Sequence, residues 1–116
     1  MSTNSDVQDS LESFAQSCNE HAQLGGMIRD WNRVFHIRAT DTAGDFTMIT
    51  DGGVVTTSAG APARPDLIVQ STAEILTAIF YGELSPNEPY NDGSLRTIGP
   101  EEDIVRLDFV IAMLWD

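Results

Sequence analysis

The sequence contains no lysine, a single cysteine and no long apolar run. Its six basic residues are all arginine and face eighteen acidic residues, so the formal net charge is −12. Nucleic acid and anionic membrane surfaces repel such a chain, and we expect neither as a partner. Cys18 alone cannot form an internal disulfide. A transmembrane helix needs about 20 consecutive apolar residues, which this sequence does not offer.

Several functional classes are excluded in the same way. Residues 1–24 lack the basic start and apolar centre of a signal peptide, which together with the lone cysteine predicts a cytoplasmic protein. No metal site is expected, because His21 and His36 belong to different elements and no His-x-x-x-His or Cys-x-x-Cys spacing occurs. No phosphate-binding loop is present, so we expect no cofactor. The length fits one domain over 1–116, with polar residues 1–4 disordered.

The expected elements run in the order helix, four strands, helix, strand, helix. Apolar residues at helical spacing predict a first helix over 6–23, opened by a capping box at Ser5-x-x-Gln8. A second capping box, Ser71-Thr72-Ala73-Glu74, opens a helix that ends at Gly82, and the last helix runs over 100–115. Strands are predicted over 33–40, 46–50, 54–58, 66–70 and 94–98. This grouping favours an α+β domain with a largely antiparallel sheet.

The stretch 81–103, YGELSPNEPYNDGSLRTIGPEED, predicts a helix end, a proline loop, a short strand and an acidic helix start. Its order G-x-L-x-P, loop, G-x-L-R-x-x-G resembles the sterol carrier protein 2 family of lipid-transfer domains. The residues that carry the resemblance are Gly82, Leu84, Pro86, Gly93, Leu95, Arg96 and Gly99, with upstream matches at Phe35–Ile37, Asp51-Gly52, Asp66 and Ser71. The resemblance implies a five-stranded sheet with helices over one face. It also implies an apolar cavity between them that holds a sterol or a fatty acyl chain.

The last helix is apolar on two sides. Ile104, Leu107 and Ile111 form one stripe, and Val105, Phe109 and Met113 form a second. A helix that is apolar all round must be covered all round, by the core, by a ligand or by a second molecule. The residues expected to line the cavity are Phe35, Ile37, Phe46, Met48, Ile75, Ile79, Phe80, Val105, Phe109 and Met113. Arg96, at an often basic position of the family pattern, is the candidate anchor for a ligand carboxylate, unless it pairs with nearby acids.

The function that this predicts is binding and intracellular transfer of an apolar lipid, without intrinsic catalysis. One alternative is a small isomerase or cyclase acting on a steroid, with Asp41, Asp45 or Asp108 as general base. Such enzymes tend to close the chain with a curved sheet, whereas this sequence closes with a helix. The other alternative is an interaction subunit whose C-terminal helix forms a homodimer or docks on a lipid-metabolising enzyme.

Overall fold

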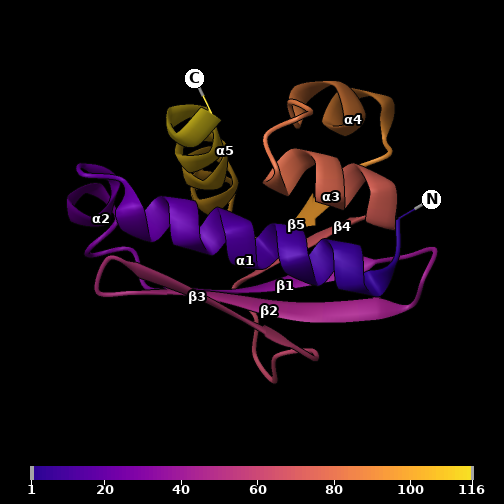
Figure 1. Cartoon of the computed structure of the whole chain (residues 1–116), viewed down its shortest axis with the longest axis horizontal. Helices are drawn as coiled ribbons and strands as arrows, with labels where there is room; N and C mark the ends of the chain where they lie inside the picture. Colours follow the sequence, from indigo (N-terminus) through magenta and orange to yellow (C-terminus); the bar gives the residue numbers. More distant parts are fainter. Residues whose placement is uncertain (1, 116) are drawn as a thin grey trace.

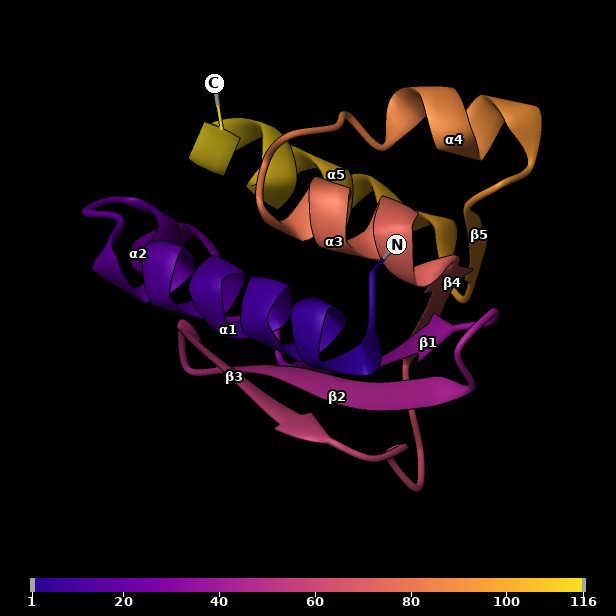
Figure 2. The ribbon, with the colours of Figure 1, turned by 45° about the vertical axis from the view of Figure 1, so that its right-hand side comes forward.

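The computed structural model describes residues 2–115, which form one sheet covered on one face by helices (Figures 1 and 2). The helices are α1 (Asn4–Glu20), α2 (Leu24–Met27), α3 (Ala73–Phe80), α4 (Asn87–Asp92) and α5 (Glu101–Trp115), and the strands are β1 (Arg33–Ala39), β2 (Gly44–Asp51), β3 (Val54–Ala59), β4 (Leu67–Ser71) and β5 (Arg96–Ile98). The predicted α+β class and the five strands are confirmed. Within the described residues, no helix combines the length and apolarity needed to cross a bilayer.

The sheet is mixed and mostly antiparallel, in the order β3-β2-β1-β4-β5. The exception is the central pair, where β4 runs parallel to β1 and Phe35 lies opposite Leu67. The connection between β3 and β4 passes beneath the sheet before β4 begins (Figure 1). Because side chains alternate along a strand, Phe35 and Ile37 point into the helix layer and are fully buried, while Arg38 is exposed.

The first helix lies across the sheet and supplies much of the core. Its apolar stripe buries Leu11, Phe14 and Cys18. The Phe14 ring meets the Phe80 ring of α3 edge-on, with 5.2 Å between the ring centres. This arrangement is one of the favourable geometries for aromatic pairs. The sheet, α1 and α3 therefore share a single core.

The start of α1 differs from the prediction. The capping box forms between Thr3 and Asp6: the Thr3 hydroxyl accepts from the Asp6 N–H, and the Asp6 carboxylate accepts from the Thr3 N–H. A threonine followed three residues later by an acid satisfies two free donors of the first turn, so the helix starts at Asn4 rather than Asp6. Thr3 and Asn4 are thus ordered at the helix start, although we expected disorder there. Met1 lies outside the described residues.

Cys18 should be chemically inert in the folded protein. Burial raises the pKa of its thiol from 9.0 to about 12, and only the thiolate is reactive. We expect a thiol-specific chromogenic reagent to label the urea-unfolded chain fully and the folded chain hardly at all near neutral pH. The folded pKa exceeds the unfolded value, so the free energy of unfolding should not depend on this thiol below pH 9.0 and should fall as the pH rises towards 12. Rapid labelling without denaturant would contradict this expectation.

The helix α4 occupies the stretch that was predicted as a proline loop, and this prediction was wrong. Pro86 has helical backbone angles, φ −68° and ψ −13°, and Pro89 lies in the first turn of the helix. Proline is tolerated there because the N–H groups of a first turn have no partner within the helix. Gly93, with a φ of 85°, ends α4 in the left-handed conformation. The segment 82–87 starts against the end of α3, where the Glu83 and Leu84 N–H groups donate to the Ala78 carbonyl, and then runs to α4 (Figure 2).

Candidate functional site

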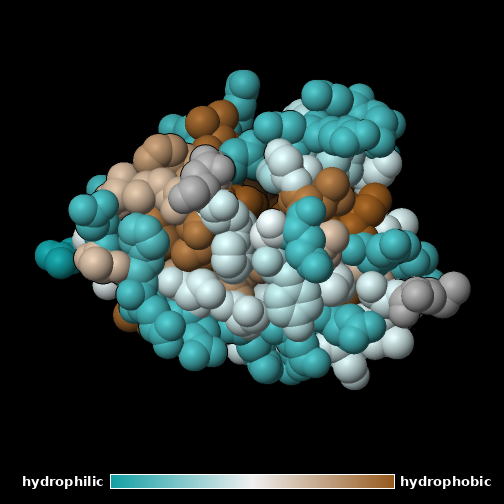
Figure 3. Space-filling model, turned by 45° about the horizontal axis from the view of Figure 1, so that its top comes forward, coloured by the Kyte–Doolittle hydropathy of each residue, from teal (hydrophilic) through white to brown (hydrophobic). Residues whose placement is uncertain are grey.

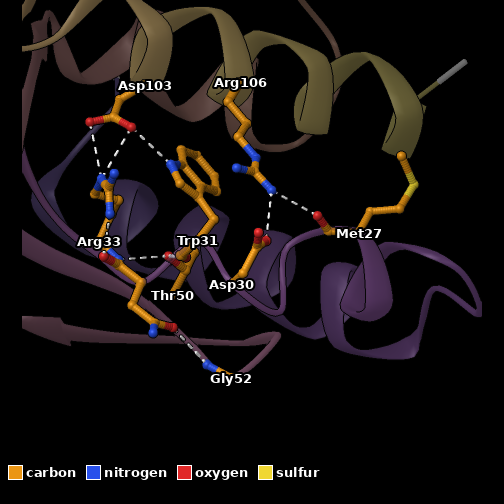
Figure 4. Close-up of polar contacts among 9 residues, drawn as sticks. Met27, Asp30, Trp31, Arg33, Thr50, Gly52, Asp103 and Arg106 are labelled. Carbon is orange, nitrogen blue, oxygen red and sulfur yellow. Dashed lines mark hydrogen bonds and ion pairs between the residues drawn. The ribbon is translucent and has the colours of Figure 1, made fainter.

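The last helix is fastened to the rest of the chain by polar contacts on its first two turns (Figure 4). The Asp103 carboxylate is buried and accepts a hydrogen bond from Trp31 Nε1 at 2.9 Å and from Arg33 Nε at 3.1 Å. One turn later, Arg106 donates to the Met27 carbonyl, pairs with Asp30 and stacks over the Trp31 ring. Sequence reasoning assigned Asp103 to the helix dipole alone and missed these contacts, because they join residues about seventy positions apart.

Beyond those two turns, α5 borders a cavity of about 280 Å³. The opposite wall is the segment that links α3 to α4. The lining residues are Gly82, Leu84, Ser85, Pro86 and Asn87 from that segment, and Asp108, Ile111, Ala112 and Trp115 from α5. This volume lies near the lower end of small-molecule sites, which begin at about 300 Å³. Figure 3, which views the helix side of the molecule, shows apolar surface gathered in the region of α5.

The end of the cavity depends on a close contact between Gly82 and Trp115. Gly82 follows α3 with a φ of 79°, as expected for a residue that ends a helix in the left-handed conformation. The Trp115 indole packs directly on this glycine, and a Cβ at position 82 would overlap the ring. Glycine is therefore required at Gly82 for two reasons, its backbone angle and its missing side chain. The sequence predicted the first reason and could not predict the second.

The cavity lining is mixed, with polar and apolar surface in similar shares. Ile111, Trp115 and Leu84 provide apolar surface, and Ser85 and Asn87 provide neutral polar groups. Asp108 is the single charged residue among the described lining residues. Partial burial raises the pKa of its carboxyl above the ordinary value. Such a site can hold an apolar chain and bind one polar group at its edge.

None of the ten residues predicted to line a cavity lines this one. The space between sheet and helices, where the cavity was expected, is filled by side chains, including Leu11 and Phe14 of α1. The predicted residues that lie buried in this core are Phe35, Ile37, Phe46, Met48, Ile79 and Phe80. Ile75 and Met113 are partly buried against it. Their role as ligand contacts remains a prediction, since it requires the core to open.

Val105 and Phe109 lie on the outer face of α5, with 60% and 49% of their surface exposed. The reason is helical periodicity. Leu107, Val110 and Ile111 turn inward and are buried, which places the second stripe on the far side of the helix. These two residues do not line a cavity in this structure. The alternative prediction, that this stripe meets a second molecule, stays a prediction.

Arg96 does not reach the cavity either. It lies on the exposed face of β5, in a shallow hollow with Tyr90, Gly93, Leu95 and Thr97. The lining residues of this hollow and of the cavity do not overlap. Among residues 2–115 Arg96 forms no ion pair, so the alternative role in charge pairing is not observed. Arg96 is exposed while its neighbour Leu95 is buried, and a role of Arg96 as ligand anchor stays a prediction.

No protein-family model matches the sequence, and no curated protein sequence matches it. Solved structures do match. The sterol carrier protein 2 of Aedes aegypti, in complex with palmitate, is 20% identical with a TM-score of 0.64, and the match covers 97% of each chain. For the sterol carrier protein domain 2 of Helicoverpa armigera the identity is 16% and the TM-score 0.67, with 95% of this chain and 88% of that chain covered.

A similar unit occurs inside a larger enzyme. The stereoselective inverting sec-alkylsulfatase of Pseudomonas sp. matches 74% of this chain at 16% identity and a TM-score of 0.63, but the chain spans only 14% of that enzyme. At these identities the likeness establishes the fold alone. The chain has the fold of the sterol carrier protein 2 domains, as the resemblance in the sequence predicted.

Proposed function

We propose that this chain is one lipid-binding domain that holds an apolar chain in the cavity between α5 and the segment 82–87. The cavity itself carries the proposal, because Leu84, Ile111 and Trp115 give it apolar surface beside a similar share of polar surface, as an amphiphilic lipid requires. The fold supports it, since a structure with this fold has been solved with palmitate. Burial of apolar surface, worth about 25 cal/mol per Å², would supply most of the affinity.

A ligand larger than the cavity requires α5 to move outward. Among the described residues, the side-chain hydrogen bonds from α5 to other elements come from Asp103 and Arg106, so apolar packing holds its later turns, which supports such movement. Outward movement would uncover the core beneath, where the predicted contacts Ile79, Phe80 and Phe35 lie. A long acyl chain or a sterol would need this opening, whereas a short alkyl chain fits the cavity as it stands.

The fold and the cavity support a binding protein rather than an enzyme. Two of the three aspartates considered as a general base have structural partners. Asp41 accepts from the Ala73 N–H at the start of α3, and Asp45 contacts the His36 ring. Asp108 alone borders the cavity. An assay for steroid isomerisation by the parent protein and by Asp108→Asn distinguishes the enzyme alternative.

A large side chain that fills the cavity should weaken the binding of an alkyl chain. We expect Ala112→Trp to lower the affinity for decanol at least tenfold, because an indole at this position occupies the space of the alkyl chain. Isothermal titration calorimetry measures the affinity, and native mass spectrometry of freshly purified protein shows whether a lipid co-purifies. If the parent protein binds no decanol and carries no lipid, the proposed function fails.

Two variants on the outer face of α5 serve as controls. Val105→Trp adds the same side chain outside the cavity, and Phe109→Asp places a charge on the exposed stripe. Both should fold and bind decanol like the parent protein. If Phe109→Asp loses binding while Ala112→Trp retains it, the ligand lies on the outer face of α5 and the cavity is not the site.

A further inference from the structure

Among the described residues that line the cavity, Asp108 is the one acidic side chain and none is basic, which bears on the kind of lipid it can take. We propose that the ligand carries a cationic head group, as in a long-chain amine, and that Asp108 binds this head group. This inference rests on the proposed lipid-binding function and specifies its ligand class.

The first support is the state of the Asp108 carboxylate. Among residues 2–115, no hydrogen bond or ion pair engages it, although desolvation raises its pKa. Asp108 is an exposed residue, so its carboxylate is accessible at the edge of the cavity. An ammonium group there would form a charge-assisted hydrogen bond with it. The alkyl chain could then lie along Ile111 and Trp115.

The second support is the end of α5 itself. Ile111, Ala112 and Trp115 line the cavity and belong to the last turns of this helix. The carboxyl-terminal turns of a helix lie towards the negative end of its dipole. The last turn of α5 that the structure describes contains no basic residue. Asp108 and the helix end therefore both attract a cation and repel a carboxylate.

The third support is the position of the arginines that could have bound an anion. Arg33 pairs with Asp103, Arg106 pairs with Asp30, and Arg96 lies in the separate hollow on β5. None of the lining residues that the structure describes is basic, and the net charge of the chain is −12. The electrostatic potential around the cavity is therefore negative. It repels a fatty-acid anion, which lowers both its rate of association and its affinity.

The test compares three ligands that share a decyl chain: decylammonium, decanol and decanoate. Isothermal titration calorimetry at neutral pH measures their affinities for the full chain. We expect decylammonium to bind at least about tenfold more tightly than decanoate, with decanol in between. In Asp108→Asn the preference for decylammonium should shrink, and decanoate should bind more tightly than in the parent protein. Asp9→Asn, the same change at an exposed position of α1, should leave all three affinities unchanged.

The outcomes separate this inference from the proposed function. If the parent protein binds decanoate as tightly as decylammonium, the inference is overturned while lipid binding stands. If the preference survives in Asp108→Asn, Asp108 is not the head-group site. If no ligand binds, decanol included, the lipid-binding function itself fails. Asp108→Asn should fold, since it removes a charge that lacks a partner, and Asp108→Ser provides a second variant of the same kind.

Discussion

Replacing Asp103 by leucine is expected to lower the free energy of unfolding by about 3 kcal/mol. The change leaves the buried Trp31 N–H without an acceptor and removes the charge partner of Arg33. The expected loss lies at the low end of the range for broken buried pairs, because the Arg33 side chain is 33% exposed and water can reach it. Urea unfolding followed by circular dichroism measures the change.

Two further variants are the controls for this loss in the free energy of unfolding. Asp103→Asn keeps a carbonyl oxygen that can accept from Trp31, so its loss should be smaller. Asp30→Leu removes the partner of Arg106 at a side chain that is 86% exposed, and such surface pairs contribute about 0–1 kcal/mol. If Asp103→Leu is as stable as Asp30→Leu, the buried pair does not hold the start of α5.

Replacing Phe80 by alanine is expected to cost about 4 kcal/mol. Phe80 is 1% exposed and lies where α1, α3 and the sheet meet. The variant loses the transfer free energy of the ring and gains an internal void that the surrounding side chains cannot fill. Domains of this kind are stable by only about 5–15 kcal/mol, so the urea midpoint should fall sharply.

The contact with Phe14 gives this prediction a second, independent measurement. A double-mutant cycle of Phe14→Ala and Phe80→Ala should show a coupling free energy of about 1 kcal/mol, the usual contribution of an edge-on aromatic pair. Tyr81→Ala, one residue further along and exposed, is the matched control and should cost much less. Equal losses at positions 80 and 81 would show that the ring of Phe80 does not fill the core as described.

Local patterns were enough to predict the α+β class and the strands, because periodicity indicates which face of an element is covered. The order of the strands and the parallel pairing of β1 with β4 did not follow from them. The predicted boundaries of the helices were less accurate. The first helix has its cap at Thr3, and α4 forms around Pro89, since several neighbouring residues could serve as cap or first turn.

The candidate site was not predictable in the same way. Whether Phe109 lines a cavity depends on the rotation of α5, and that rotation is set by the contacts of Asp103 with residues far away in the sequence. The position of α1 decides whether the space between the sheet and the helices is empty or filled. The periodicity of the sequence does not predict where α1 lies on the sheet. Asp108 was considered only as a general base, because its place beside Trp115 appears only once α5 and the segment 82–87 are brought together.

The polar contacts of α5 lie near its start, whereas apolar packing holds its later turns, so a change in the angle of the helix pivots about Asp103. Trp115 lies twelve residues further along the helix, about 18 Å away at 1.5 Å per residue. A rotation of about 10° at this pivot therefore moves the Trp115 end by about 3 Å, while the same rotation barely displaces the first turn. The width of the cavity at Trp115 is thus far more sensitive to the angle of α5 than are the hydrogen bonds that hold the helix in place.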